Sequence, residues 1–431
     1  MGTLGGVSKP SRDGTRPAEP ADSPRDRPGA VMTETRRGYK QTEVGVIPED
    51  WEAKTVGQIS TVGRGRVISH REISRSRNPA YPVYSSQTSN NGVMGYLDSF
   101  DFEGEYITWT TDGANAGTVF HRHGRFNCTN VCGTIKLSSD HHVFVAKVLS
   151  RFAHLHVSRH LGNPKLMNDV MKRVKVPLPS TLAEQESIAE ALSDVDALIE
   201  SLEQLLTKKR QIKQGAMQEL LTGKKRLQGF GGDWKACRVE DVADVKTGPF
   251  GSSLHERDYV EDGIPIITVE HLGEFGVMHA NLPKVSDIDW RRLEAYTLQE
   301  YDIVFSRVGS IDRNALIRAA EVGWLFSGRL LRLRPNRERA FPPYLSYQFH
   351  TDTFKQRVKG VAVGQTMACL STKILSGVEV LLPSVSEQTA IATILSDMDA
   401  EIATLETKLS KARQLKQGMM QELLTGRTRL V

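Results

Sequence analysis

The sequence predicts an α+β protein in which two mixed α/β domains are separated by two long helices that pair as an antiparallel coiled coil. Three observations lead to this fold class. Residues 184–227 align without gaps to residues 387–430, with about 28 identical positions. The blocks before the two copies, roughly 50–179 and 233–383, barely resemble each other. Both blocks end in a proline-bounded apolar stretch, KVPLP or EVLLP, which predicts a final strand.

The repeat divides the chain into five expected segments. Residues 1–37 contain repeated Pro, Gly and Arg and no aromatic residue, so we expect a disordered extension that cannot bury enough apolar surface to fold. Met32 within it is a second candidate start of translation. The other expected segments are a first variable domain at 38–179, a helix at 180–227, a second variable domain at 228–383 and a helix at 384–431.

The repeated segments carry apolar residues with the alternating spacing of a heptad seam. This spacing predicts long helices whose apolar stripe packs against a partner helix. An ordinary amphipathic helix packed on its own domain is the alternative, but two copies in one register favour pairing with each other as a pseudo-twofold monomer. Gly223 and Gly426 are the expected helix stops. The seam residues are Ile188, Leu192, Val195, Ile199, Leu202 and Leu206, matched by Ile391, Leu395, Met398, Ile402, Leu405 and Leu409.

Composition limits the class of protein. Hydrophobic residues make up 39% and charged residues 25% of the chain, as is ordinary for a soluble globular protein. No apolar run approaches the roughly 18 residues of a membrane span, and we find no secretory signal. Four cysteines are too sparse for a disulfide framework, so a reducing cytoplasm is expected. The net charge of +5 favours an anionic partner.

Polar loops in the variable domains predict contacts to DNA. Stretches such as YPVYSSQTSNNGVMGY and KTGPFGSSLHERDY combine glycine turns with Ser, Thr, Asn, Arg and Lys. These side chains hydrogen-bond base edges and phosphates. The candidate DNA-binding residues are Arg64, Arg66, Ser85, Ser86, Thr111, Asn115, Arg122 and Lys165 in the first domain, and Lys246, Ser252, Ser253, Arg307, Ser310, Arg313, Gln365 and Lys373 in the second.

Three motifs resemble catalytic or metal sites without meeting their chemical requirements. Phe341 begins a Phe-Pro-Pro-Tyr sequence, but an amino-methyltransferase needs a hydrogen-bond acceptor at that first position. The sequence from Gly223 lacks the upstream glycine and the Ser or Thr of a phosphate-binding loop. A further group has zinc-ligand side chains in a spacing that is not a common finger pattern. It comprises His121, His123, Cys128 and Cys132. We therefore expect no catalytic residue, metal or cofactor in this chain.

Several stretches together resemble the DNA-specificity subunit of a type I restriction–modification enzyme, from about residue 38 to the end of the chain. They include the EQ pairs at 184–185 and 387–388, LSDVDALI and LSDMDAEI, and KQGAMQELLTGKKRL and KQGMMQELLTGRTRL. The stretches GVIPEDW, GFGGDW, YITWTTDGANAGTVF and GQTMACLSTKIL also fit.

This resemblance implies a fold and a set of partners. Each variable domain would be a target-recognition domain, and the helices would form an antiparallel coiled coil in a cyclic pseudo-twofold monomer. Two methyltransferase subunits that bind S-adenosylmethionine would dock on it, joined by restriction subunits that use ATP and Mg. The target would be a bipartite, asymmetric site with adenine methylated in each half.

The function that we expect is therefore non-catalytic recognition of double-stranded DNA, which directs the partner enzymes to a bipartite site. Two alternatives remain open. The chain is a coiled-coil scaffold with no role on DNA, or it carries its own DNA methyltransferase activity. The absence of a glycine-rich loop after a strand argues against the second alternative.

Overall fold

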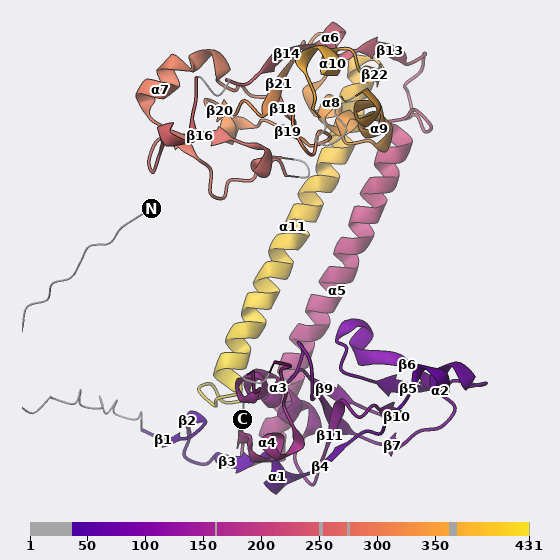
Figure 1. The fold of residues 1–431 in the computed structure, drawn as a ribbon, viewed down its shortest axis with the longest axis vertical. Helices are drawn as coiled ribbons and strands as arrows, with labels where there is room; N and C mark the ends of the chain where they lie inside the picture. Colours follow the sequence, from indigo (N-terminus) through magenta and orange to yellow (C-terminus); the bar gives the residue numbers. More distant parts are fainter. Residues whose placement is uncertain (1–36, 160–161, 250–252, 274–275, 362–368, 431) are drawn as a thin grey trace, which may run out of the picture. The chain divides into compact units, whose positions relative to one another are not determined.

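A computed structural model describes residues 37–159, 162–249, 253–273, 276–361 and 369–430. The chain divides into two compact units, one formed by residues 1–189 with 421–431 and the other by residues 190–420 (Figure 1). The expected N-terminal extension, with Met32, lies outside the described residues except for Arg37.

The first unit is built from two small sheets and two strand pairs. One antiparallel sheet has the order β4-β11-β8-β9, and a second, mixed sheet has the order β6-β5-β10-β7. The first sheet comprises β4 (Ser60–Arg64), β11 (Cys132–Leu137), β8 (Tyr106–Thr110) and β9 (Val119–Arg122). The second comprises β6 (Val93–Leu97), β5 (Tyr81–Tyr84), β10 (Arg125–Cys128) and β7 (Phe102–Glu103). The pairs are β1 (Tyr39–Thr42) with β2 (Gly45–Pro48) and β3 (Glu52–Thr55) with β12 (Lys175–Leu178).

Short helices cover these sheets. Helix α3 buries Phe144, Val148 and Leu149, and the ring of Phe144 meets the edge of the buried Trp51 at 6.5 Å. Burial of these large side chains supplies the apolar core of the unit. The helices are α1 (Val56–Ile59), α2 (His70–Arg75), α3 (His142–Phe152) and α4 (Asn168–Arg173), with 3₁₀ turns at Ser89–Gly92 and Ala153–His156.

The second unit repeats the frame with different contents. Its sheets have the orders β14-β21-β18-β19 and β15-β17-β16-β20. The strands of the first are β14 (Ala243–Thr247), β21 (Leu330–Pro335), β18 (Ile303–Ser306) and β19 (Asn314–Leu316). Those of the second are β15 (Tyr259–Val260), β17 (Lys284–Val285), β16 (Ile264–Ile267) and β20 (Leu325–Phe326), and β13 (Lys235–Arg238) pairs with β22 (Glu379–Leu382).

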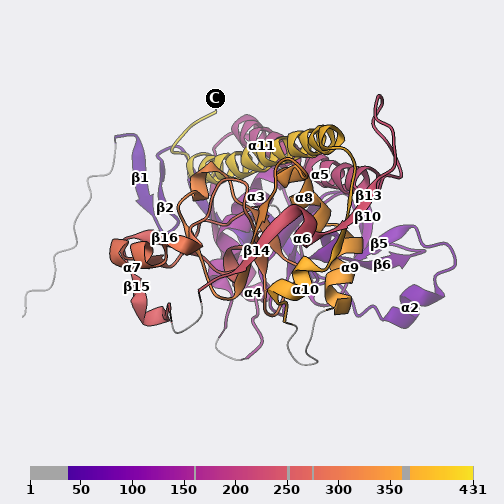
Figure 2. The ribbon, with the colours of Figure 1, turned by 90° about the horizontal axis from the view of Figure 1, so that it is seen from above.

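In the second unit α8 lies beside the two long helices, whereas α7 lies near β15 and β16 (Figure 2). The shared core contains Tyr344 and Leu345 of α8 together with Leu220, Ile391 and Leu395. The helices are α6 (Val239–Val242), α7 (Asp287–Arg292), α8 (Pro342–Phe349), α9 (Asp352–Val361) and α10 (Thr372–Ser376), with 3₁₀ turns at Glu256–Asp258, Val269–His271, Glu294–Tyr296 and Ala319–Glu321.

Both predicted closing strands are confirmed. KVPLP contains β12, which pairs antiparallel with β3, and EVLLP contains β22, which pairs antiparallel with β13. In each unit the opening strand of the variable block is thus tied to its closing strand. The residues between them can differ because this pairing involves backbone groups, whose hydrogen bonds do not depend on the side chains.

The repeated segments form two helices of 39 residues each, α5 (Leu182–Leu220) and α11 (Val385–Leu423). Glycine stops follow both, because Gly223 and Gly426 adopt φ of +72° and +70°, a region that favours glycine. Within residues 190–420 the two helices contact each other through Leu206, Leu405 and Leu409.

Ion pairs flank these leucines. From Asp196 to Lys213 on α5 the partners on α11 run overall from Lys416 down to Asp399, so the contacting stretches run in opposite directions. The pairs are Asp196 with Lys416, Glu203 with Arg413, Lys209 with Glu401, Arg210 with Glu406 and Lys213 with Asp399.

Each repeat also binds the other through an arginine near its end and a glutamate near its start. In the second unit both nitrogens of the Arg226 fork donate to Glu387 at 2.7 Å. In the first unit Arg429 donates to Glu184, with an Nη2–Oε2 distance of 2.8 Å, and also to Asp50. Both glutamate side chains are only 1% exposed. We call these two contacts the arginine–glutamate clamps.

The clamps share a surrounding structure. The Arg429 guanidinium lies 5.8 Å from the Trp51 ring, and Arg226 lies 5.7 Å from the Trp234 ring. Hydrogen bonds to Glu184 and then to Asp50 raise the pKa of Arg429 above its usual range. The arginine charge in each clamp compensates a carboxylate that burial would otherwise destabilise.

The glutamine after each glutamate fixes the adjoining domain. Gln185 accepts a hydrogen bond from the backbone of His141 at 2.9 Å, and Gln388 accepts one from Phe341 at 2.8 Å. Each glutamine also donates to the carbonyl of a proline that follows the closing strand. The repeated EQ dipeptide therefore ties each helix to the domain that precedes it.

We predict that Arg429→Ala lowers the free energy of unfolding by about 3 kcal/mol, because it leaves the buried Glu184 without its counter-charge. The matched control is Arg427→Ala, which removes an exposed arginine 3.7 Å from Glu422 and should change stability by less than about 1 kcal/mol. The double variant Glu184→Gln/Arg429→Gln should be less destabilised than Arg429→Ala alone. Chemical denaturation measures all three, and equal stability of the two single variants would contradict a clamp.

Candidate nucleic-acid interface

In the first unit, three predicted residues converge on the carboxylate of Asp112. Thr111 donates to it at 2.7 Å, while Arg64 Nη2 and Lys165 Nζ lie 3.8 and 3.9 Å from its oxygens. Arg64 ends β4, and the backbone of Lys165 forms an isolated bridge to Asp112. Arg64 and Lys165 are exposed, whereas Thr111 is buried and presents no surface to a nucleic acid.

Arg122, also predicted to contact DNA, lies inside the first unit. Its side chain is 3% exposed, and it donates to the hydroxyl of Thr108 and to the carbonyl of Asn91 at 3.2 and 2.9 Å. Its guanidinium lies 3.6 Å from the centre of the Tyr84 ring. Burial lowers its pKa. The residue joins the two sheets of the unit, and the polar environment of its segment gave no sign of this burial.

The remaining predicted residues of the first unit differ in exposure. Arg66 is held by Glu72 and Asp101 at 2.6 and 2.9 Å. Asn115 is exposed and donates to the hydroxyl of Thr88 at 3.2 Å. The half-buried Ser85 accepts from Thr129 at 3.2 Å, and its neighbour Ser86 is also half-buried.

In the second unit, the predicted cations mostly bind backbone carbonyls. Lys246 donates to Ala295 at 2.7 Å, Arg307 donates to the Thr247 hydroxyl at 3.2 Å, and Arg313 donates to the Leu272 carbonyl.

The other five predicted residues of this unit comprise two exposed side chains, one half-buried side chain and two positions without a description. Ser310 and Lys373 are exposed, and the carbonyl of the half-buried Ser253 accepts from Arg292 at 2.6 Å. Ser252 and Gln365 lie outside the described residues. The exposed subset of the predicted residues is therefore Arg64, Arg66, Asn115, Lys165, Ser310 and Lys373.

The loop-based prediction missed a group of exposed cations on and after α2. Arg71, Arg75 and Arg77 are all exposed, and none forms an ion pair within the described part of the chain. The sequence signal was the run HREISRSR, whose charge density is higher than that of the loops that were chosen.

The residues with zinc-ligand side chains have other surroundings in the structure. No group of three metal-binding side chains occurs among the residues that the structure describes. Cys128 and Cys132 are buried free thiols. His121 instead lies 3.6 Å from Glu105, which also lies 3.4 Å from His142. Burial lowers the pKa of both histidines, and the Glu105 carboxylate partly opposes this shift.

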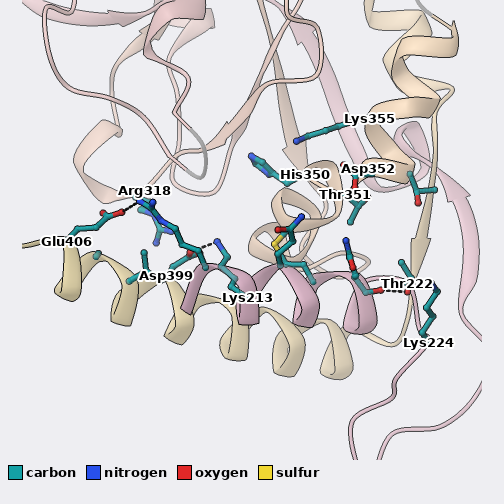
Figure 3. Close-up of a pocket in the computed structure, with 17 residues that line it drawn as sticks. Lys213, Thr222, Lys224, Arg318, His350, Thr351, Asp352, Lys355, Asp399 and Glu406 are labelled. Carbon is teal, nitrogen blue, oxygen red and sulfur yellow. Dashed lines mark hydrogen bonds and ion pairs between the residues drawn. The ribbon is translucent and has the colours of Figure 1, made fainter. Parts of the chain in front are cut away.

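The second unit also contains a cavity of about 670 Å³ between the long helices and the start of α9. Figure 3 shows Lys213 and Thr222 on the helix side, facing Lys355 and His350 on the domain side. The lining includes the cations Lys224, Arg318 and Lys355, which form no ion pair with any described residue, and the apolar side chains of Met217 and Ile402.

Comparison with known proteins identifies the family. The family model for the type I restriction modification DNA specificity domain matches residues 48–214 and 231–414, which is most of the chain. The chain belongs to this family. Both halves match it, in agreement with the two repeated frames.

Individual relatives agree with this assignment. The specificity subunit of the type I restriction enzyme MjaVIII from Methanocaldococcus jannaschii is 22% identical over 405 residues, 89% of this chain and 94% of that protein. A type I specificity subunit N-terminus from Mycoplasma pneumoniae is 44% identical over 140 residues, 32% of this chain and 73% of that protein.

A solved structure shares the fold. The crystal structure of the S subunit of a type I restriction–modification system from M. genitalium is 17% identical and has a TM-score of 0.62. The similarity covers 86% of this chain and 96% of that chain. Among the described residues, no helix of this specificity-family protein is long and apolar enough to cross a membrane.

We predict that the two histidines beside Glu105 make stability depend on pH. Their folded pKa values lie below the ordinary value of 6.5, so the unfolded chain takes up protons first as the pH falls. Stability should be full above pH 7 and should decline as the pH falls through 6.5 towards 5. The variant His121→Gln/His142→Gln should weaken this decline, whereas the exposed His123→Gln should preserve it. Chemical denaturation across this range tests the prediction, and parallel curves for the two variants would contradict it.

Proposed function

We propose that this chain is the non-catalytic DNA reader of a type I restriction–modification enzyme, with one half of a bipartite, asymmetric site read by residues 38–179 and the other by residues 228–383. The observation that carries the proposal is the pair of similar frames with dissimilar contents. Each frame is closed by its own strand pair and followed by a nearly identical helix. Such a design allows two recognition surfaces to vary independently.

Catalysis belongs to partner subunits in this proposal. Two methyltransferase subunits carry S-adenosylmethionine and modify adenine, and restriction subunits use ATP and Mg. The chain itself supplies the recognition of double-stranded DNA in the cytoplasm. Its four free cysteines agree with a reducing compartment.

The long helices are proposed to form an antiparallel coiled coil that gives the subunit a pseudo-twofold arrangement, with helix segments at 180–227 and 384–431. Support comes from the seam leucines Leu206, Leu405 and Leu409 and from the ion pairs that flank them. The pairs Arg210–Glu406 and Glu203–Arg413 are equivalent when one repeat is exchanged for the other. An experimental structure without interdigitated seam residues would contradict the coiled coil.

The central prediction is that the two recognition blocks are exchangeable. Replacing residues 50–179 with the corresponding block of another family member should change one half of the methylated sequence and leave the other half unchanged. The reciprocal replacement of residues 233–383 is the matched control and should alter the opposite half. Methylation-site sequencing of cells that express each hybrid with its partner subunits gives the result. Modularity is wrong if either hybrid changes both halves or neither.

Among the predicted DNA contacts, we propose that the exposed residues bind DNA directly and that the buried ones hold the loops in place. The support is the contrast between exposed Arg64 and buried Arg122, which belong to the same unit. A buried arginine that stacks on Tyr84 has no donor group available to a base edge. Ser252 and Gln365 remain candidate contacts from their sequence context alone.

Arg64→Ala and Lys373→Ala should therefore weaken binding to the cognate duplex without a loss of stability. A lost base contact costs about 1–3 kcal/mol of binding free energy. A lost phosphate contact lowers the magnitude of the slope of log K against log salt concentration by about one. Arg122→Ala should lower the melting temperature because it removes hydrogen bonds and ring contacts inside the fold. Fluorescence anisotropy and thermal denaturation separate the two effects. Unchanged affinity for both exposed variants would overturn this assignment.

We further propose that the cavity in the second unit receives an acidic part of a methyltransferase subunit. Its lining has more cations than its own carboxylates neutralise, and Arg318, Lys224 and Lys355 form no ion pair in the described chain. Residues of the repeat, including Met217 and Thr222, supply one wall. Because this wall consists of residues of the repeated segment, a partner subunit that binds the chain twice can contact the same kinds of side chain at both positions.

Arg318→Ala/Lys355→Ala should reduce co-purification with the methyltransferase subunit by about tenfold or more, since each lost charge-assisted hydrogen bond is worth roughly 1.5–3 kcal/mol. The matched control is Arg357→Ala/Lys359→Ala. It removes the same charge from two residues of α9 that do not line the cavity. Native mass spectrometry of the wild-type complex tests the ratio of two methyltransferase subunits to one chain. Equal recovery with both double variants would exclude the cavity as the docking site.

A further inference from the structure

We propose that Arg71, Arg75 and Arg77, here called the α2 arginine patch, form a sequence-independent binding site for DNA phosphates in the first unit. The inference rests on the proposed DNA-reading function and extends it to an element outside the predicted recognition loops. Figure 1 shows α2 beside β5 and β6 of the second sheet of this unit. All three side chains are exposed.

The patch has a fixed platform. The hydroxyl of Ser69 accepts from the backbone of Glu72 at 3.2 Å and caps α2. Ile73 anchors the opposite side against a small core of Ile68, Val83 and Leu97. The helix is thus held in place although its outer surface is highly charged.

A close approach at β6 explains how Ile73 is accommodated. A Cβ atom at Gly95 would lie 2.6 Å from the Ile73 side chain, so only glycine allows this contact. The chain after the helix is fixed as well, because Asp98 accepts hydrogen bonds from the backbone of Arg77 and Asn78 at 3.1 and 2.9 Å.

Among the described residues, the nearby carboxylates form no ion pair with the arginines of the patch. Glu72 and Asp101 both bind Arg66, at 2.6 and 2.9 Å. Asp98 accepts from two backbone N–H groups, and no ion pair between it and the side chain of Arg77 occurs in the described chain. These carboxylates lower the net positive charge of the region, but the three guanidinium groups keep donors that no carboxylate of the described chain engages in an ion pair.

This charge arrangement is slightly unfavourable, and a bound anion would relieve the repulsion. Arg71 and Arg75 are four residues apart on one helix, a spacing at which like charges repel and destabilise the helix. Arginine is also the side chain that binds phosphate through two parallel hydrogen bonds. A row of phosphates along one DNA strand offers negative charges at a spacing that several arginines on one short segment can contact at once. Backbone phosphates carry no sequence information, so such contacts would raise affinity without a choice of sequence.

The test compares wild-type complex, assembled from the full chain and its partner subunits, with the variant Arg71→Ala/Arg75→Ala/Arg77→Ala. Binding to a duplex that carries the methylated site is measured across salt concentrations. The variant should lose affinity by about tenfold or more at 100 mM salt, and the slope of log K against log salt should fall in magnitude by about 2–3. The methylated sequence should be unchanged.

Two further variants make the result specific. Arg71→Lys/Arg75→Lys/Arg77→Lys keeps the charge and should retain most of the slope. Lys40→Ala/Lys54→Ala/Lys175→Ala removes the same charge from lysines held by Glu49, Glu52 and Glu43, and it should leave the slope unchanged. Melting curves of all variants should match that of the wild type.

Each other outcome overturns the proposal in a distinguishable way. An unchanged slope in the alanine variant excludes phosphate binding by the patch while leaving the DNA-reading function intact. A changed methylated sequence would mean that the patch reads bases. Loss of partner subunits with an unchanged salt slope would assign the patch to an acidic protein surface. Absence of site-preferring binding by the wild-type complex would refute the DNA-reading function itself, together with this inference.

Discussion

The two arginine–glutamate clamps are the contacts on which the architecture depends. Glu184 and Glu387 are almost fully buried carboxylates, and burial of an unpaired carboxylate is strongly unfavourable. Each finds its counter-charge at the end of the opposite repeat, through Arg429 at a separation of 245 residues and through Arg226 at 161 residues. Every repeat therefore provides one glutamate and one arginine. This reciprocal requirement gives a physical reason why both the first and the last residues of the repeat are duplicated.

The clamps, the EQ glutamines and the strand pairs β3–β12 and β13–β22 fix only the borders of each variable block. The interior of each block is held by its own sheets and by buried residues such as Trp109 and Phe305. Side chains on the connecting loops can change without disturbing these borders, because the borders rest on backbone pairing and on residues of the repeat. A reader of two unlike half-sites needs this separation between constant and variable parts.

Electrostatics distinguishes structural cations from cations available to a ligand. Along the helices, Arg210, Arg413 and Lys416 are paired with carboxylates of the opposite helix and so act as structural cations. The charge of Arg122 is enclosed by rings and a carbonyl group inside the fold and is not available to a ligand. The modest net charge of the chain therefore conceals an uneven distribution. Cations without an ion pair among the described residues include those of the α2 arginine patch and three that line the cavity of the second unit, as expected for surfaces that bind anionic partners.

The sequence alone determined the repeat, the two long helices, their glycine stops and the strands that close each block. These features depend on local periodicity and on turn chemistry, which nearby residues encode. The family resemblance was also readable, because it rests on the same repeated phrases. The partner of Glu184 was not readable, since hundreds of residues separate it from Arg429 and no local pattern links them.

Tertiary structure decided which polar residues face solvent. Thr111 and Arg122 belong to segments as polar as those of Arg64 and Lys165, yet the first two are buried and the last two are exposed. Burial depends on how β8 and β9 pack against residues distant in the chain, and sequence periodicity cannot report this for short strands between turns. Local sequence patterns therefore predicted the fold, whereas the assignment of individual contact residues required the packed structure. The reason is that the exposure of a side chain to a ligand depends on its neighbours in space.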